Sequence, residues 1–139
     1  MIRRAILSCL LLLVLPLQAL SADDPIMIVG HASLGKTDLS TVQRLYSGRA
    51  VSIGDKTAIP INLRANSPVR ESFLSAIMGQ SEEQYTGYWL VRRYVGKGTP
   101  PEEVSDVAEV LRLIATMPGA VGYVPLSALP SGANVIFRR

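Results

Sequence analysis

The sequence predicts an α/β domain with a mixed β-sheet, because strand-like segments alternate with helix-like segments along it. Residues 26–29 are four apolar residues in a row, a pattern typical of a buried strand. Residues 59–63 alternate apolar and polar positions, and a helical pattern follows directly after them. We therefore expect residues 23–139 to form a single domain, in which about four helices flank the sheet.

The segment at 59–79 is interpreted as a strand, a polar turn and a helix. One face of the strand is predicted to be buried, which places Arg64 at the strand's exit. Ser67 is a favoured N-cap residue, and Pro68 suits the first helical position because an N–H there would lack a helical partner. The helix is expected to end at Gly79 and to bury a stripe made of Val69, Phe73, Ala76 and Ile77.

Two capping boxes predict two further helices. Ser40 with Gln43 fits the start of a short helix that ends near residue 48, so that residues 47–49 form a turn. Ser81 with Gln84 fits the start of a longer helix that reaches about residue 95. The aromatic residues of this helix are spaced so that core packing is favoured over a ligand wall: Tyr85, Tyr88 and Trp89.

The last third of the chain is predicted to contain one helix and two strands. Residues 96–101 form a break, after which Ser105 or Asp106 caps a helix with a buried stripe. Residues 117–119 end that helix. Residues 120–124 and 135–137 are predicted strands.

The first 22 residues have the pattern of a secretory signal peptide. Arg3 and Arg4 form a basic start, about 13 apolar residues follow, and small residues suited to cleavage come next. The apolar run is shorter than the roughly 20 residues that span a bilayer, so no stable membrane anchor is expected. The mature protein is predicted to be secreted through this cleavable signal peptide.

Composition excludes several classes of function. The chain has 14 Lys and Arg against 11 Asp and Glu, and without Arg3 and Arg4 the mature net charge is about +1. A net charge this small does not indicate a nucleic-acid partner, so none is expected. Cys9 is the single cysteine, and it lies within the signal peptide. The mature chain is thus without disulfides, a cysteine nucleophile or a thiolate metal site.

The polar turn at 64–70 is the best candidate for a binding site. A strand end, an arginine and a helix N-terminus meet there, and exposed backbone N–H groups with the helix dipole favour an anion. Arg64 can offer a bidentate fork, and Ser67 a hydroxyl. Arg70 in the first helical turn opposes the dipole at a cost of about 0.3–1 kcal/mol, which a bound anion would reverse. The alternative is that Ser67 is an ordinary cap, with Glu71 and solvent satisfying the arginines.

The other candidates give weaker signals. His31 is the single histidine and lacks neighbouring ligands in metal-binding spacing, so a structural hydrogen bond is expected. Arg92, Arg93 and Lys97 suit a helix C-terminus, where the dipole favours cations. No catalytic triad or paired carboxylates can be assembled, so neither enzyme activity nor a cofactor is predicted.

Several segments together resemble the substrate-binding proteins of phosphate ABC transporters, within the type 2 periplasmic binding protein superfamily. They are the SGR turn at 47–49, the arginine-to-serine turn at 64–67, the tryptophan followed by GKGTPP, and PGAVGYV at 118–124. The resemblance extends from about Leu39 to Pro125. It implies one periplasmic α/β lobe and a tetrahedral oxyanion, with Arg64 and Ser67 as the matching contacts and Asn66 between them. Together with the pattern of the turn itself, this predicts an oxyanion site at Arg64, Asn66, Ser67 and Arg70.

The chain departs from the family pattern in two ways. Pro68 and Val69 stand where the family has Gly and Thr, which removes a backbone donor and a hydroxyl. Each lost charge-assisted hydrogen bond costs about 1.5–3 kcal/mol. Family members with two lobes close around the ligand, whereas this chain resembles one lobe. A homodimer or a partner protein could supply the second wall.

Two hypotheses follow, with an enzyme a distant third. The first is a solute-binding protein that engages phosphate or a similar oxyanion without catalysis and works with an ABC transporter permease. The second is an envelope interaction module derived from a binding-protein lobe, which contacts a transporter or a sensor and binds no solute.

Overall fold

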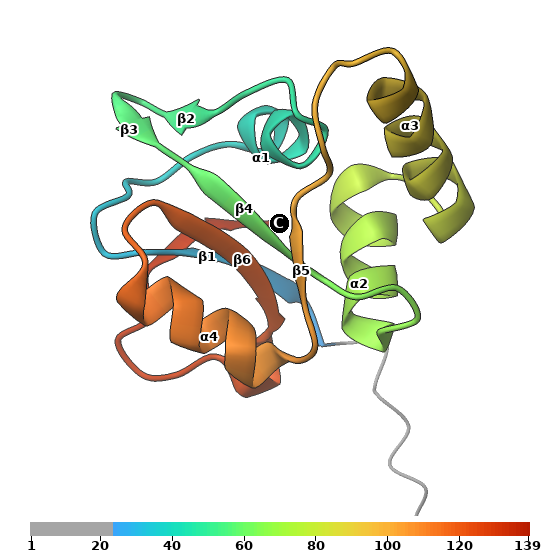
Figure 1. Ribbon diagram of the computed structural model, residues 1–139. Coiled ribbons are helices and arrows are strands. Elements are labelled where there is room, and N and C mark those ends of the chain that lie inside the picture. The colour runs from blue at the N-terminus through green and yellow to red at the C-terminus, as the bar shows by residue number, and fades with distance from the viewer. Residues whose placement is uncertain (1–23) are drawn as a thin grey trace, which may run out of the picture.

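The computed structural model describes residues 24–139 (Figure 1). The predicted signal peptide, residues 1–22, lies outside the described residues. Within 24–139, no helix is both long enough and apolar enough to cross a membrane.

A five-stranded mixed sheet forms the centre of the molecule, in the order β5-β4-β6-β1-β7. β4 runs parallel to both β5 and β6, whereas β1 runs antiparallel to β6 and β7. The strands are β1 (Ile26–Gly30), β4 (Ile59–Leu63), β5 (Glu102–Val104), β6 (Ala120–Pro125) and β7 (Val135–Arg138). A short hairpin of β2 (Ser52–Ile53) and β3 (Lys56–Thr57) precedes β4. The predicted α/β class is confirmed.

Helices cover both faces of this sheet (Figure 1). They are α1 (Leu39–Tyr46), α2 (Pro68–Phe73), α3 (Glu82–Tyr94) and α4 (Val107–Thr116). Phe73 of α2 stacks on Tyr123 of β6 with ring centroids 3.9 Å apart. On the preceding residue of β6, a Cβ added to Gly122 would lie 2.5 Å from the Val110 side chain of α4. Because successive strand residues point to opposite faces, α2 and α4 lie on opposite sides of the sheet.

The aromatic residues of α3 attach that helix to the rest of the fold. Tyr85 and Trp89 are buried, and both donate hydrogen bonds to the carbonyl oxygen of Tyr46, at 2.9 and 3.2 Å. Tyr88 is partly buried and donates to the carbonyl oxygen of Ser47 at 2.7 Å. The prediction that these aromatic residues belong to the core is confirmed.

The start of α1 differs from the prediction. Asp38 is the N-cap residue, and its Oδ1 accepts a hydrogen bond from the Thr41 N–H at 2.8 Å. Ser40 therefore lies inside the helix, and Gln43 donates to the carbonyl oxygen of Ile77. Asp and Ser are comparable N-cap residues, so the sequence alone did not separate the two starts.

The predicted stripe of the second helix is wrong at one position. After α2 the chain forms a π-helical turn, Leu74–Met78, before Gly79 ends it with φ of 64°. The wider turn exposes Ala76 and buries Leu74, so the buried positions become Arg70, Phe73, Leu74 and Ile77. π-turns of this kind are not visible in apolar periodicity.

β4 and β5 also differ from expectation. Asn62 is buried with Ile61 and Leu63, so the end of β4 is covered on both faces, while Ile59 at its start is exposed. β5 was not predicted, because a segment of three residues beginning with two glutamates has no apolar pattern. It forms by pairing with β4.

The chain needs a glycine at position 119. Gly119 has φ of 83°, and a Cβ added there would collide with the carbonyl oxygen of Thr57. Gly132 has a similar φ of 77°, but a Cβ there would meet nothing within 4 Å.

Gly119→Ala should lower the free energy of unfolding by roughly 3 kcal/mol or more, and Gly132→Ala by about 1 kcal/mol. Urea denaturation of both variants measures the difference, and equal losses would contradict the close approach.

Candidate functional site

A hollow lies at the carboxyl ends of the parallel strands β4 and β5. Its volume is about 570 Å³, and the β4–α2 loop and the β5–α4 loop supply most of its lining. The lining residues are Leu63, Arg64, Ala65, Asn66, Ser67, Pro68, Ser105, Asp106 and Val107. α2 and α4 leave these adjacent strands toward opposite faces, which is the arrangement that opens a crevice in α/β sheets.

The turn from β4 into α2 is held by its backbone. The Arg64 N–H donates to the carbonyl oxygen of Val104 at 3.0 Å, which ties the loop to β5. Asn66 has φ of 69° and is the one non-glycine residue between 24 and 139 with a positive φ. Asn tolerates this left-handed conformation better than most residues. Ser67 then caps α2, with its Oγ 3.4 Å from the Arg70 nitrogen, and Pro68 occupies the first helical position.

The Arg64 side chain is available to a ligand. It is exposed, and its guanidinium makes no hydrogen bond or ion pair with any residue that the structure describes. Its position on the hollow therefore agrees with the predicted site. Asn66 and Ser67 line the same hollow, so the structure brings three of the four predicted site residues together.

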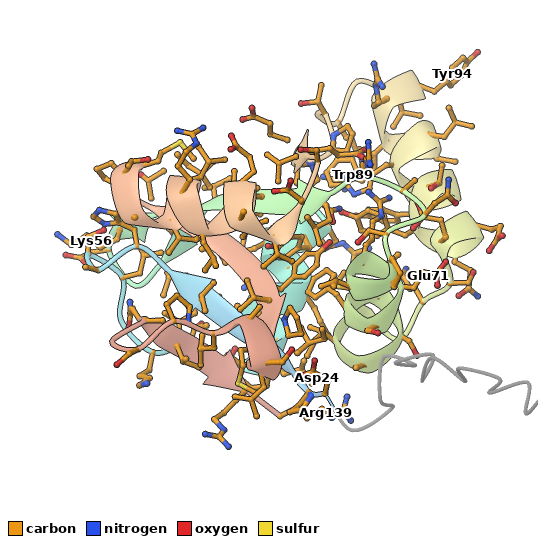
Figure 2. The ribbon with its side chains drawn as sticks, turned by 90° about the horizontal axis from the view of Figure 1, so that it is seen from below. Asp24, Lys56, Glu71, Trp89, Tyr94 and Arg139 are labelled. Carbon is orange, nitrogen blue, oxygen red and sulfur yellow. The ribbon has the colours of Figure 1, made fainter. Side chains whose placement is uncertain are left out.

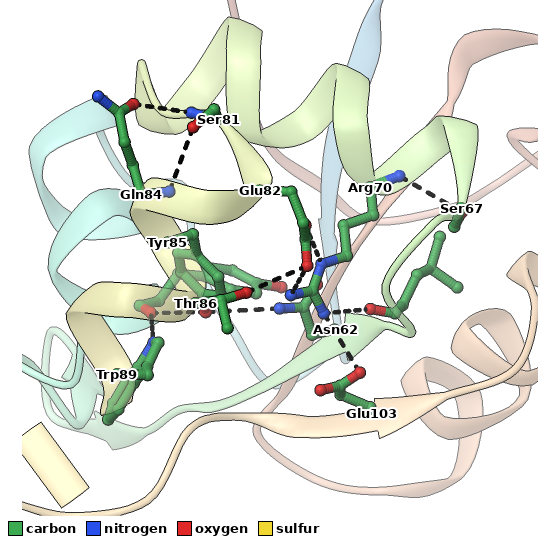
Figure 3. A network of polar contacts seen from close by, with 12 residues as sticks. Asn62, Ser67, Arg70, Ser81, Glu82, Gln84, Tyr85, Thr86, Trp89 and Glu103 are labelled. Atoms are coloured by element: carbon green, nitrogen blue, oxygen red, sulfur yellow. Dashed lines mark hydrogen bonds and ion pairs between the residues drawn. The ribbon is translucent and has the colours of Figure 1, made fainter. Parts of the chain in front are cut away.

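Arg70, the fourth predicted residue, does not line the hollow. Its side chain is 4 % exposed and turns back under the strand end (Figure 3). Nε and Nη2 donate to the two carboxylate oxygens of Glu82 at 2.9 and 2.7 Å, and Nη1 donates to the carbonyl oxygen of Leu63 at 2.8 Å. A Glu103 oxygen lies 3.2 Å from Nη1. The alternative interpretation, in which Glu71 and solvent satisfy the arginines, is wrong for Arg70. Its main partners are Glu82 and the carbonyl oxygen of Leu63.

A second layer of polar contacts surrounds Arg70. Its guanidinium lies 5.4 Å from the ring centroid of Tyr85, and the Asn62 amide reaches the Tyr85 hydroxyl at 3.4 Å. The Tyr123 hydroxyl donates to the side-chain Oδ1 of Asn62 and accepts from the Leu63 N–H. Asn62, Tyr85 and Tyr123 thus fix the end of β4 against α3 and β6. The sequence had indicated neither Glu82 nor Asn62, because their partners are distant along the chain.

Burial changes the acidity of the tyrosines in this layer. Loss of solvent raises the pKa of Tyr85 to about 12 and raises the pKa of Tyr123 well above its ordinary value. Both hydroxyls therefore stay protonated and act as hydrogen-bond donors at neutral pH. They are structural groups and not acids or bases for catalysis at that pH.

Asp106, in the loop between β5 and α4, adds a negative charge to the lining of the hollow that Arg64 also lines. Its Oδ1 caps α4 by accepting from the Glu109 N–H at 2.9 Å. The N-terminus of α4 is therefore already satisfied by a carboxylate, and Asp106 repels a second anion. Arg64 and Asp106 leave the hollow close to neutral, so attraction for an anion depends on hydrogen bonds more than on net charge.

The remaining candidate residues lie away from this hollow. The His31 ring Nδ1 is 2.8 Å from the Ser33 hydroxyl, and no group of three or more metal-ligating side chains occurs among residues 24–139. Arg92 packs over the rings of Tyr88 and Trp89 and donates to the carbonyl oxygens of Gly48 and Lys97. It is a structural part of the α3 C-terminus.

Comparison with known proteins finds the fold in phosphate receptors. No family model and no curated protein matches the sequence. One similar solved structure is an ABC-type phosphate transport receptor from Vibrio cholerae, with 17 % identity and a TM-score of 0.62. A second is a putative phosphate ABC transporter substrate-binding protein with bound phosphate from Clostridium perfringens, with 15 % identity and a TM-score of 0.62. A third is PstS from Borrelia burgdorferi, with 14 % identity and a TM-score of 0.60. Each match covers 81 % of this chain.

This chain shares its fold with part of each of these three proteins. The match covers 45, 44 and 46 % of the three receptors in the same order, so the chain spans less than half of their length. The resemblance to phosphate-binding components that the sequence indicated is therefore confirmed at the level of fold.

The two arginines of the turn should differ sharply in their effect on stability. Arg70→Ala leaves Glu82 and Glu103 without their cation and should lower the free energy of unfolding by about 3–5 kcal/mol. Arg64→Ala removes an exposed side chain and should change it by less than about 0.5 kcal/mol. Urea denaturation followed by tryptophan fluorescence measures both. Equal losses would refute the structural role assigned to Arg70.

The buried tyrosines predict a loss of stability at alkaline pH. The pKa of Tyr85 is raised to about 12 in the folded state, so the unfolded chain loses this proton first, from about pH 10 upward. At pH 11 this costs on the order of 1 kcal/mol for Tyr85 alone, relative to pH 8. Tyr85→Phe should be less stable at pH 8 but lose less between pH 8 and 11. Tyr94→Phe, at a 92 % exposed position, should lose as much as the unaltered protein.

Proposed function

We propose that this chain is a periplasmic solute-binding protein that binds phosphate or a similar oxyanion without catalysis. The observation that supports this most is the hollow at the ends of β4 and β5, which Arg64, Asn66 and Ser67 line. The chain also shares its fold with part of two phosphate transport proteins. The predicted signal peptide supports the periplasmic location. An ABC transporter permease is the proposed partner.

Each donor has a specific role in this proposal. Arg64 supplies the positive charge and a bidentate fork, while the Ser67 hydroxyl and the first backbone N–H groups of α2 supply hydrogen bonds. Asn66 holds the turn and offers an amide. Arg70 acts indirectly: its backbone N–H donates to Ser67 Oγ and orients that hydroxyl, while Glu82 and Glu103 neutralise its side chain.

Asp106 gives the site a preference among oxyanions. A carboxylate that repels every anion can still accept a hydrogen bond from an anion that carries a proton. Phosphate is partly protonated at neutral pH, whereas sulfate is not. We therefore infer that phosphate is favoured over sulfate, and that binding is weak because Pro68 removes a donor and Arg64 is exposed to competing water.

The second candidate function is an envelope interaction module that binds no solute. Pro68 and Val69 favour it, because they remove two donors from the turn. The carboxylate of Asp106 favours it as well, since it already occupies the N-terminus of α4. A sensor or a transporter would then be the partner.

Calorimetric titration with phosphate, sulfate and chloride separates the two functions. Phosphate should bind more tightly than the other two anions, and Arg64→Ala should weaken it by about tenfold or more, in line with a lost charge-assisted hydrogen bond. Asp106→Asn keeps a capping residue and removes the charge, so it should tighten sulfate binding more than phosphate binding.

Arg138→Ala serves as the matched control, because Arg138 is an exposed arginine on β7 outside the hollow. It should leave phosphate binding unchanged. A phosphate affinity equal to that for chloride, or equal effects of Arg64→Ala and Arg138→Ala, would exclude the binding site and leave the interaction module.

A further inference from the structure

The C-terminal half of α3 carries apolar side chains that the fold leaves in solvent. The α3 apolar face consists of Leu90, Val91, Tyr94 and Val95, which are 70, 63, 92 and 56 % exposed. At 100° per residue these side chains cover an arc of about 140°, on the side of the helix opposite Trp89. Figure 2 shows Trp89 directed into the molecule and Tyr94 directed away from it. Contiguous exposed apolar side chains are a mark of an interaction surface.

Cations lie on both sides of the α3 apolar face. Residues 84–101 contain three Lys and Arg and no Asp or Glu. Arg93 lies about 60° around the helix from one edge of the apolar arc, and Lys97 follows in the turn after the helix. At the other edge, Arg49 from the turn after α1 places its guanidinium 5.8 Å from the Tyr88 ring centroid. An apolar arc with basic side chains at both edges is typical of a helix in a membrane interface.

The chain does not neutralise these cations. Arg49, Arg93 and Lys97 are exposed, and none of them forms an ion pair with a residue between 24 and 139. Long basic side chains can bury their stems against apolar groups while the charged heads reach outward. A complementary surface is therefore anionic where it meets the cations and apolar where it meets the centre of the arc. An anionic phospholipid bilayer combines the two, because its phosphates lie directly above its acyl chains.

Glu83 and Tyr94 determine the orientation of such a contact. Glu83 is exposed on the same side of α3, but it lies seven residues before Leu90, or about 10 Å along the axis. A helix lying flat would press this carboxylate against the anionic headgroups, so α3 is expected to tilt with its C-terminal end toward the bilayer. Tyr94 then lies at the level of the headgroups, where tyrosine is enriched in membrane proteins.

We propose that the C-terminal end of α3 docks this protein on anionic phospholipid bilayers. The α3 apolar face enters the headgroup region, and Arg49, Arg93 and Lys97 contact lipid phosphates. The contact is peripheral and reversible, because only four apolar side chains enter the bilayer and α3 is not a membrane-spanning helix. No residue of 84–101 lines the hollow at β4 and β5. Failure of the proposed phosphate binding would therefore leave this proposal intact, and the reverse also holds.

Cosedimentation with phospholipid vesicles tests the contact. The protein is purified without residues 1–22, because the apolar run of the predicted signal peptide would itself insert into lipid. Its affinity should be about 100-fold higher for mixed phosphatidylglycerol and phosphatidylcholine vesicles than for phosphatidylcholine alone. Each of the three cations contributes about fivefold to that ratio near an anionic surface. High salt should weaken the binding, because exposed charges are screened.

Substitutions at Tyr94 test the apolar part of the contact. Tyr94→Glu should weaken binding to the anionic vesicles by about tenfold or more, because it sets a carboxylate against the headgroups. Tyr94→Phe keeps the apolar ring and should bind as the unaltered protein does. Ser131→Glu, at an exposed position between β6 and β7, adds the same charge elsewhere and should have no effect.

Paired substitutions test the cations. Arg93→Gln with Lys97→Gln should weaken binding to the anionic vesicles by about 25-fold, which follows from the loss of two cations. Arg138→Gln with Arg139→Gln is the matched control, because it removes two exposed arginines at the end of β7 and should have little effect. Equal losses in the two double variants would show that net charge alone attracts the protein, and would overturn the proposal.

The hollow at β4 and β5 is the other place where a headgroup phosphate could bind. Arg64→Ala should bind the anionic vesicles as the unaltered protein does. A loss of vesicle binding in Arg64→Ala, with none in Tyr94→Glu, would place the lipid phosphate in the hollow and overturn the proposal. Equal affinity for the two kinds of vesicle, or no binding to either, would overturn it as well. The absence of any binding would leave a protein surface as the occupant of the α3 apolar face.

Discussion

The ion pair between Arg70 and Glu82 is the interaction on which the arrangement of the fold most depends. Arg70 comes from α2 and Glu82 from α3, while Glu103 on β5 completes the neutralisation. The same guanidinium holds the carbonyl oxygen of Leu63, the last residue of β4. One buried cation therefore joins two helices and two strands at the point where the hollow begins. Such a cation is tolerated only because every partner is in place.

This arrangement explains why two arginines six residues apart have different roles. Both follow β4, but Arg64 lies in the loop and Arg70 in the first turn of α2, where its side chain reaches Glu82 (Figure 3). Arg64 precedes the helix and stays in solvent. The separation leaves the candidate ligand site with one cation, opposed by Asp106. A site with so little net charge must discriminate by the direction of its hydrogen bonds.

Much of the fold could be predicted from the sequence because its signals are local. The capping box of Ser81 and Gln84, the Ser67 cap and the apolar run of β1 each depend on residues within one turn or strand. β5 and the burial of Asn62 could not be predicted, since both exist only through contacts with distant segments. The polar turn that lines one side of the hollow was predicted for the same reason. Arg64, Asn66 and Ser67 are consecutive or nearly so, whereas Asp106 joins them only after β5 has paired with β4.

The hydrogen bond between the Arg64 N–H and the carbonyl oxygen of Val104 has a consequence for the order of folding. It joins residues 40 positions apart, across a parallel strand pair that α2 and α3 must first connect. Within the five-stranded sheet this is nevertheless the shortest separation, because β4 pairs with β6 across 61 residues (Ile59 to Ala120) and β1 pairs with β6 across 99 (Ile26 to Pro125). The entropy lost on closing a loop grows with its length, so β4 and β5 are expected to pair before β1 joins the sheet. The lining of the hollow would then form before the sheet is complete.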